Sequence, residues 1–97
     1  MNRTEILSLL EHRREEIKQN FAVKHIALFG SAARNELRDD SDIDVLVEFS
    51  GPSTFDGYFN LKDYLEKLLG RPIDLVTNKG LKPRARHHVE RDLVHVA

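Results

Sequence analysis

Two aspartates, Asp42 and Asp44, are separated by a single residue and precede the apolar run Val45-Leu46-Val47. Because alternate side chains of a strand point to the same face, these two carboxylates would lie roughly 6.6 Å apart along one face. Two like charges placed side by side cost free energy unless a cation neutralises them. The spacing therefore predicts a metal-binding pair, and the alternative is an exposed polar pair on an edge strand.

A glycine-serine pair precedes these aspartates. The apolar run that ends at Phe29 stops at Gly30-Ser31, and ten residues separate Ser31 from Asp42. Glycine allows a sharp turn or a close approach of bare backbone to a ligand. Ser31 would then lie at the start of a helix, where unpaired N–H groups attract phosphate. A phosphate-binding turn beside a carboxylate pair predicts phosphoryl or nucleotidyl transfer.

A third carboxylate interrupts another apolar run. Asp74 is the one charged residue between Ile73 and Thr77. A carboxylate is costly in an apolar strand if it is buried alone, so Asp74 either points to solvent or belongs to a site. With Asp42 and Asp44 already placed, we favour the site.

The sequence assigns the flanking residues less firmly. Arg34 falls in an expected short helix, where its guanidinium suits a nucleotide phosphate; the alternative is surface pairing with Glu36 or Asp39. Ser41 would hydrogen-bond the acidic turn or cap Asp42. We count Arg34 and Ser41, with Gly30 and Ser31, as candidate nucleotide-binding residues.

Hydrophobic periodicity and capping signals predict the elements that position these residues. Asn2 and Glu5 form the pattern of a capping box, and Pro83 suits the first position of a last helix with Ala85 and Val89 on its inner face. The expected helices cover residues 3–20, 32–37 and the stretch between a cap at Ser53 or Thr54 and Gly70; the expected strands cover residues 24–29, 73–77 and the run that begins at Asp42.

The site also constrains the topology. If Ser31 and Asp42 touch one triphosphate, the end of the first strand adjoins the start of the second, so these strands run antiparallel. A full helix between the second and third strands permits a parallel crossover. We predict an α/β fold with a small mixed sheet of three or four strands flanked by helices.

Composition sets the limits on function. The chain has 97 residues, 40% of them hydrophobic and 32% charged, which predicts one globular domain over residues 1–97 without a separate substrate lobe. A net charge of −1 gives no basic footprint for direct nucleic-acid binding. The absence of cysteine excludes disulfides and thiolate zinc sites. No apolar run approaches the length of a membrane span, so we expect a cytoplasmic protein.

The motif Gly30-Ser31, ten residues, then Asp42-Ile43-Asp44 resembles the signature of the nucleotidyltransferase superfamily related to DNA polymerase β. The short chain, the run SDIDVLVEF and the later run Pro72-Ile73-Asp74-Leu75-Val76 are similar to its minimal branch. This branch comprises the MNT antitoxins that pair with HEPN ribonuclease toxins. The resemblance implies a nucleotidyltransferase fold and a site role for Asp74.

The expected chemistry uses ATP and two Mg²⁺ ions, since oxygen ligands and substrate phosphates suit this cation. Asp42 and Asp44 would bridge both ions, Asp74 would hold the acceptor-side ion and receive the hydroxyl proton, and Gly30 and Ser31 would hold the terminal phosphates.

For this family, the implied reaction is transfer of AMP from ATP to a tyrosine hydroxyl of a cognate HEPN toxin, which silences the toxin. Two alternatives stay open: a non-catalytic antitoxin that occludes the toxin, and a nucleotidyltransferase that modifies a small molecule. The sequence leaves open whether the chain forms a homo- or hetero-oligomer.

Overall fold

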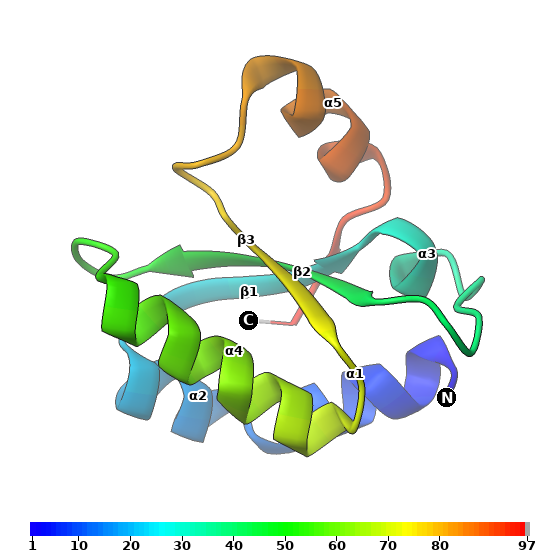
Figure 1. Cartoon of the computed structure of the whole chain (residues 1–97), viewed down its shortest axis with the longest axis horizontal. Helices are drawn as coiled ribbons and strands as arrows, with labels where there is room; N and C mark the ends of the chain where they lie inside the picture. The colour runs from blue at the N-terminus through cyan, green and yellow to red at the C-terminus, as the bar shows by residue number, and fades with distance from the viewer. Residues whose placement is uncertain (97) are drawn as a thin grey trace.

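The computed structural model describes residues 1–96, which form helices packed on a mixed sheet (Figure 1). The strands are β1 (Val23–Phe29), β2 (Ile43–Phe49), β3 (Ile73–Thr77) and β4 (Val94–His95). The helices are α1 (Arg3–His12), α2 (Arg14–Phe21), α3 (Gly30–Ala33), α4 (Phe55–Leu69) and α5 (Pro83–Arg91).

The sheet has the order β3-β2-β1-β4. β1 pairs with β2 in antiparallel orientation, whereas β2 and β3 are parallel and are joined by the crossover helix α4. This confirms the expected mixed sheet and both predicted strand directions. The short β4 pairs antiparallel with the free edge of β1 and supplies the fourth strand.

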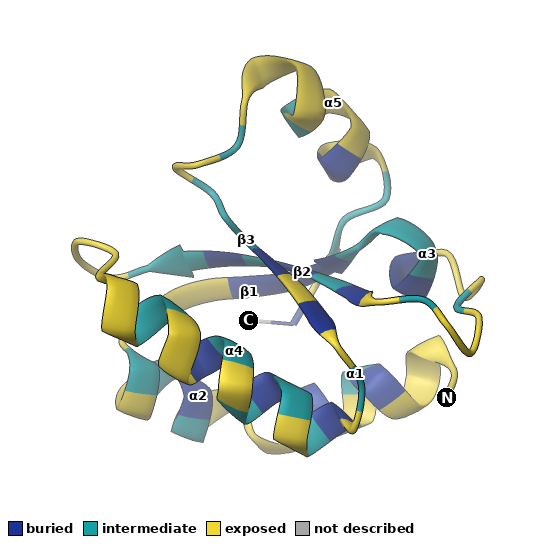
Figure 2. Ribbon diagram, in the orientation of Figure 1, coloured by how far each residue is buried: buried dark blue, intermediate teal, exposed yellow. Residues whose placement is uncertain are grey.

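The two faces of the sheet differ. Helices α1, α2 and α4 cover one face, while α5 stands over the other (Figure 1). Burial follows the alternation of β2: Ile43, Val45 and Val47 are fully buried toward the helices, where they meet Leu61 and Leu65 of α4. Figure 2 shows the same division, with the buried positions of the helices facing the sheet. The opposite face, which we call the open face, carries polar and apolar side chains, among them Asp44, Leu46 and Glu48 of β2.

Capping residues define most helix ends as expected. The Asn2 side chain accepts a hydrogen bond from the Glu5 N–H, and Thr54 Oγ1 accepts one from the Gly57 N–H at 3.0 Å. Gly70 ends α4 in the left-handed region with φ of 68°, and Pro83 begins α5. Within residues 1–96, no helix has both the length and the hydropathy to span a membrane.

Three helix predictions were wrong in detail. The helix expected over residues 3–20 is two helices, because Arg13 leaves helical geometry with ψ of 8°. Between Leu10 and Ile17 no hydrophobic residue is buried in the core, so packing does not hold this stretch in one helix. On α5 only Val89 of the predicted inner pair is buried, whereas Ala85 is exposed.

The third difference concerns the short helix, which covers Gly30–Ala33 rather than residues 32–37. It ends early because Asn35 adopts a left-handed φ of 60°. The Asn35 side chain accepts a hydrogen bond from the Arg3 N–H at 2.9 Å, which holds this bend against the start of α1. Arg34 is therefore the residue that caps α3 and does not lie inside a helix.

Candidate active site

Asp44 and Asp74 are partners in the parallel pairing of β2 and β3, so their side chains lie next to each other on the open face. Their strand neighbours Ile43, Val45 and Ile73 are buried in the helix layer, which leaves the carboxylates to point the other way. Asp42 lies two residues before Asp44, directly ahead of β2. The fold thus gathers the three predicted aspartates at one end of the sheet.

The environment of Asp44 raises the pKa of its carboxyl to about 6. Partial burial is the largest cause, followed by the negative charge of Asp74, a hydrogen bond with Asp74 and the charge of Asp42. The positive charge of Arg34 acts in the opposite direction. A cation bound beside the Asp44 carboxylate would offset these unfavourable interactions.

Gly30 lies against Asp44 across the β1–β2 pair. Phe29 is the register partner of Asp44, and Gly30 follows it with a left-handed φ of 66°. A Cβ atom built at position 30 would overlap the Oδ2 atom of Asp44. Glycine is therefore required here for two reasons, the backbone conformation and the space taken by the carboxylate.

Ser31 is the second residue of α3 and is half-buried beside this bend. With only four residues, α3 develops little of the dipole of a long helix. Any phosphate held at the bend would depend on the backbone N–H groups and on the Ser31 hydroxyl themselves. The predicted phosphate-binding turn is thus next to the carboxylates, in the predicted place.

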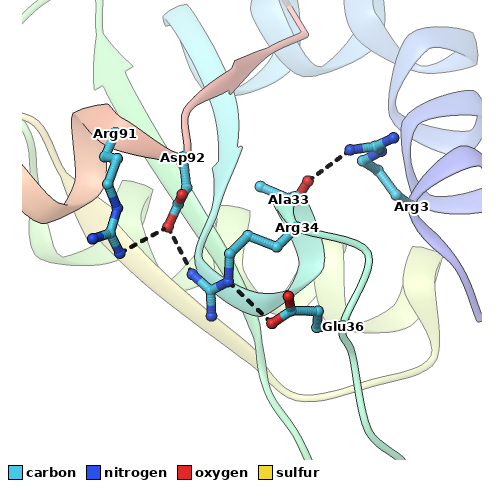
Figure 3. Close-up of polar contacts among 6 residues, drawn as sticks. All are labelled: Arg3, Ala33, Arg34, Glu36, Arg91 and Asp92. Carbon is cyan, nitrogen blue, oxygen red and sulfur yellow. Dashed lines mark hydrogen bonds and ion pairs between the residues drawn. The ribbon is translucent and has the colours of Figure 1, made fainter.

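Arg34 makes two ion pairs at the exposed end of α3 (Figure 3). Its Nη1 contacts Asp92 Oδ2 at 2.7 Å, and its Nε contacts Glu36 Oε2 at 3.2 Å. These hydrogen bonds raise the pKa of Arg34 and lower that of Asp92. The surface pairing considered for Arg34 is correct for Glu36, and its second partner is Asp92 rather than Asp39.

The loop before Asp42 is fastened to the start of β3 by Arg71. The Arg71 Nη2 donates to the carbonyl oxygen of Ser41 at 2.9 Å and to that of Arg38. Ser41 Oγ accepts a hydrogen bond from the Arg38 N–H at 3.3 Å, as expected for a residue that closes the turn. Arg71 therefore fixes the backbone that presents Asp42.

The donor set at this end of the sheet suits a hard divalent cation. Among residues 1–96, no group of three or more His, Asp or Glu side chains is already arranged around one point as a metal site. Mg²⁺ nevertheless commonly takes one or two carboxylates and completes its shell with water and substrate phosphates. The adjacent Asp44 and Asp74 meet that requirement, and their mutual repulsion is relieved by a cation.

Asp92 and Arg71 were not singled out from the sequence. Asp92 is 58 residues from Arg34, and its role depends on how α5 returns over the sheet. Arg71 offered a weak signal, since it stands just before the strand that carries Asp74, but a hydrogen bond to two backbone carbonyls leaves no pattern in a single sequence.

Comparison with known proteins connects this geometry to a family. The model of the nucleotidyltransferase domain matches residues 10–95. Protein adenylyltransferase MntA of Thermococcus cleftensis is 39% identical over 92 residues, which are 95% of this chain and 93% of that protein.

Solved structures agree with the fold. A structure provisionally described as a minimal nucleotidyltransferase is 38% identical, with a TM-score of 0.77 over 97% of this chain and 95% of that chain. A chain from the complex of a tri-AMPylated Shewanella oneidensis HEPN toxin with an MNT antitoxin is 19% identical. It has a TM-score of 0.69 and covers 94% of this chain and 71% of its own length, so this likeness concerns the fold.

Proposed function

The chain belongs to the family of nucleotidyltransferase domains, and we propose that it transfers AMP from ATP to a tyrosine hydroxyl of a cognate HEPN toxin. In this role the protein acts as an antitoxin, since the added adenylate silences the toxin. The similar protein from Thermococcus cleftensis is a protein adenylyltransferase, which supports AMP as the transferred group.

One observation carries this proposal: the Asp44 and Asp74 carboxylates adjoin each other and the Gly30 bend. A scaffold that only binds a partner gains nothing from a partly buried carboxyl beside two other carboxylates, where burial first and repulsion second raise the pKa of Asp44 to about 6. The same arrangement is useful when cations and a triphosphate enter between the bend and the strands.

Mg²⁺ would be held by Asp42, Asp44 and Asp74. When bound, the metal supplies charge neutralisation at the phosphates and lowers the pKa of the attacking hydroxyl. Gly30 and Ser31 would bind the terminal phosphates through backbone N–H groups and the hydroxyl, and Arg34 would add positive charge at their outer side. Ser41 shapes the turn beside the nucleotide.

The reaction itself requires positioning more than covalent chemistry. The acceptor oxygen forms a bond to the α-phosphorus of ATP while the bond from that phosphorus to the β-phosphate bridging oxygen breaks, and pyrophosphate leaves. Asp74, next to Asp44, receives the hydroxyl proton. Placing the two oxygens in line and neutralising the developing charge supply most of the acceleration.

The acceptor is expected to be a protein. The described elements build one sheet and its helices and leave no second lobe to enclose a small acceptor. A protein acceptor presents its hydroxyl group on its own surface and needs no enclosing lobe. The complex of an AMPylated HEPN toxin with an MNT antitoxin, which shares this fold, indicates which partner to test.

The test is to mix the protein with ATP, Mg²⁺ and the product of the neighbouring gene, as the proposed HEPN partner, and to weigh that partner. We expect a gain of one or more adenylate groups, and none with the Asp42→Asn variant. No gain, or a gain that survives this substitution, would overturn the proposal.

A non-catalytic antitoxin that occludes the toxin is the second candidate. Cells that express the toxin separate the two cases. Protection by a variant with Asp42, Asp44 and Asp74 all changed to asparagine would favour occlusion, whereas loss of protection favours catalysis.

A further inference from the structure

Two hollows lie between α5 and the open face of the sheet, and both are lined by Val89 of α5. One is beside the Gly30 bend and the other is beside β1 and β2. Figure 1 shows α5 standing over this face, connected to the sheet through the segments at its two ends. The two hollows are therefore neighbours beneath α5, with the Val89 side chain in the lining of both.

The linings of the two hollows differ in charge. The hollow at the bend, of about 210 Å³, is lined by Gly30, Phe29 and Val89 together with Arg34, His88, Arg91 and the carboxylate of Asp92, so its charged side chains include two arginines. The other hollow, of about 130 Å³, has an apolar lining that includes Ala27, Leu46, Leu81 and Leu93. Its polar lining includes Glu48.

The strand register aligns this second hollow with the carboxylates. Asp44, Leu46 and Glu48 alternate along the open face of β2, and Ala27 is the register partner of Leu46. At about 3.3 Å per residue, Leu46 is about 7 Å and Glu48 about 13 Å beyond Asp44. A nucleotide whose phosphates lie at the Gly30 bend reaches this hollow with its base if it extends along β2.

We propose that the apolar hollow under α5 binds the base of the nucleotide, and that Glu48 selects a purine that carries its exocyclic amine at position 6. This inference rests on the proposed nucleotidyl transfer and adds the base-binding residues to it. An apolar slot with few polar groups at its edge is typical of sites that hold a flat heterocycle.

Glu48 supplies the selectivity because a carboxylate only accepts hydrogen bonds. The N6 amine of adenine donates to it, whereas guanine bound in the same orientation would present its O6 carbonyl, which the carboxylate repels. The carboxylate is 4.0 Å from Lys24 Nζ, a loose contact at the strand edge that a base could share. Two other charged side chains line this hollow, Arg86 and Glu90 of α5. Arg86 donates to the side chain and the carbonyl of Asn78 at 3.1 Å each, and Glu90 lies 3.9 Å from Arg86 Nη1, so both already have partners on their own side of the hollow.

The first experiment compares binding of the whole nucleotide with binding of its phosphates alone. The Leu46→Phe variant fills the hollow, and Val76→Phe is its matched control, because Val76 is the register partner of Leu46 on β3 and does not line the hollow. Calorimetry would measure binding of ATP and of inorganic tripolyphosphate in Mg²⁺ buffer. We expect Leu46→Phe to weaken ATP binding about tenfold and to leave tripolyphosphate within about twofold, with Val76→Phe neutral for both.

Several results would overturn this assignment. They are unchanged ATP binding in Leu46→Phe, an equal loss for both ligands, or a wild-type protein that binds ATP no more tightly than tripolyphosphate. A wild-type protein that binds neither ligand contradicts nucleotidyl transfer itself, and the base site with it. Intact ATP binding without transfer would instead count against the proposed reaction alone.

The second experiment does not depend on how well Leu46→Phe folds. We expect the wild-type protein to bind ATP about tenfold more tightly than GTP, and Glu48→Gln to reduce that ratio to about twofold, because the amide also donates to O6. A ratio that is near unity in the wild type, or that Glu48→Gln leaves unchanged, would contradict the role of Glu48.

Discussion

The Cα of Gly30 faces the carboxylate of Asp44 so closely that a methyl group at position 30 would overlap the Asp44 Oδ2 atom. The bend that is expected to bind phosphate and the strand that carries the carboxylate are thus fitted to each other. A ligand that touches the Gly30 backbone necessarily comes within reach of Asp44. This contact places the expected phosphate-binding turn and the acidic strand in one candidate site.

The Gly30→Ala substitution should therefore damage both stability and nucleotide binding. We expect it to destabilise the protein by about 2 kcal/mol, from the left-handed φ and the displaced carboxylate, and to weaken ATP binding about tenfold. Thermal melts and calorimetry measure the two effects. Gly51→Ala is the control, because a Cβ there meets no atom within 4 Å; equal effects at the two positions would contradict the fit of Gly30 to Asp44.

Replacing Asp44 should stabilise the fold while removing the chemistry. Its carboxyl is ionised at neutral pH against burial and two like charges, so Asp44→Asn relieves an unfavourable interaction. We expect a gain of about 1 to 2 kcal/mol at pH 8, which is less than the full shift implies because solvent reaches the side chain. Denaturant unfolding without metal checks this, and a destabilised Asp44→Asn variant would show that the environment of Asp44 is described wrongly.

The same carboxyl gives a pH dependence with a definite sign. Its pKa is about 6 in the folded protein against 3.8 for the ordinary group, so the folded state binds more protons between these values. By linkage, the free energy of unfolding contributed by Asp44 rises as pH falls from about 6 to 4. The difference in stability between Asp44→Asn and the wild type should therefore shrink over this range and be constant above pH 7. A difference independent of pH would contradict it.

Arg34 and Asp92 make opposite predictions for ATP binding. Removing the guanidinium in Arg34→Ala should weaken binding about tenfold, since a charge-assisted hydrogen bond to phosphate is lost. Asp92→Asn should tighten binding about threefold, because the carboxylate that now holds Arg34 at 2.7 Å competes with phosphate for it. Calorimetry on both variants distinguishes competition from positioning: a loss in Asp92→Asn as large as that in Arg34→Ala would mean that Asp92 positions the arginine.

Arg71 should affect the rate more than the binding of nucleotide. Its guanidinium holds the carbonyls of Arg38 and Ser41 and so fixes the backbone ahead of Asp42. We expect Arg71→Met to lower the transfer rate about tenfold with ATP affinity within about twofold, because the carboxylate is displaced but not removed. Arg14→Met, at an exposed position on α2, serves as the control. An unchanged rate in Arg71→Met would show that the loop needs no such support.

Much of this architecture follows from local signals in the sequence. The strand Ile73–Thr77 was predicted at its observed bounds because Pro72 and the turn at Asn78 to Gly80 delimit an apolar run. The antiparallel and parallel pairings followed from requiring Ser31 and Asp42 to adjoin and from the length of α4. The strand register pairs Asp44 with Asp74, as the site hypothesis predicts.

What escaped prediction depends on contacts between distant segments. The early end of α3 reflects the contact of Asn35 with Arg3, and the pairing of Arg34 with Asp92 requires α5 to return over the sheet. The break at Arg13 was missed because Leu10 and Ile17 are compatible with one continuous helix as well as with two. Hydrophobic periodicity in a single sequence does not predict these tertiary contacts.

Asp44 and Asp74 are expected to act as one catalytic unit, and a double-mutant cycle on the transfer rate tests this. With labelled ATP, Mg²⁺ and the HEPN partner, we predict that Asp44→Asn, Asp74→Asn and the double variant all lose a similar factor, at least about a thousandfold, because removing either carboxylate disables the pair. A rate near that of the wild type in Asp74→Asn, or losses that multiply in the double variant, would contradict it.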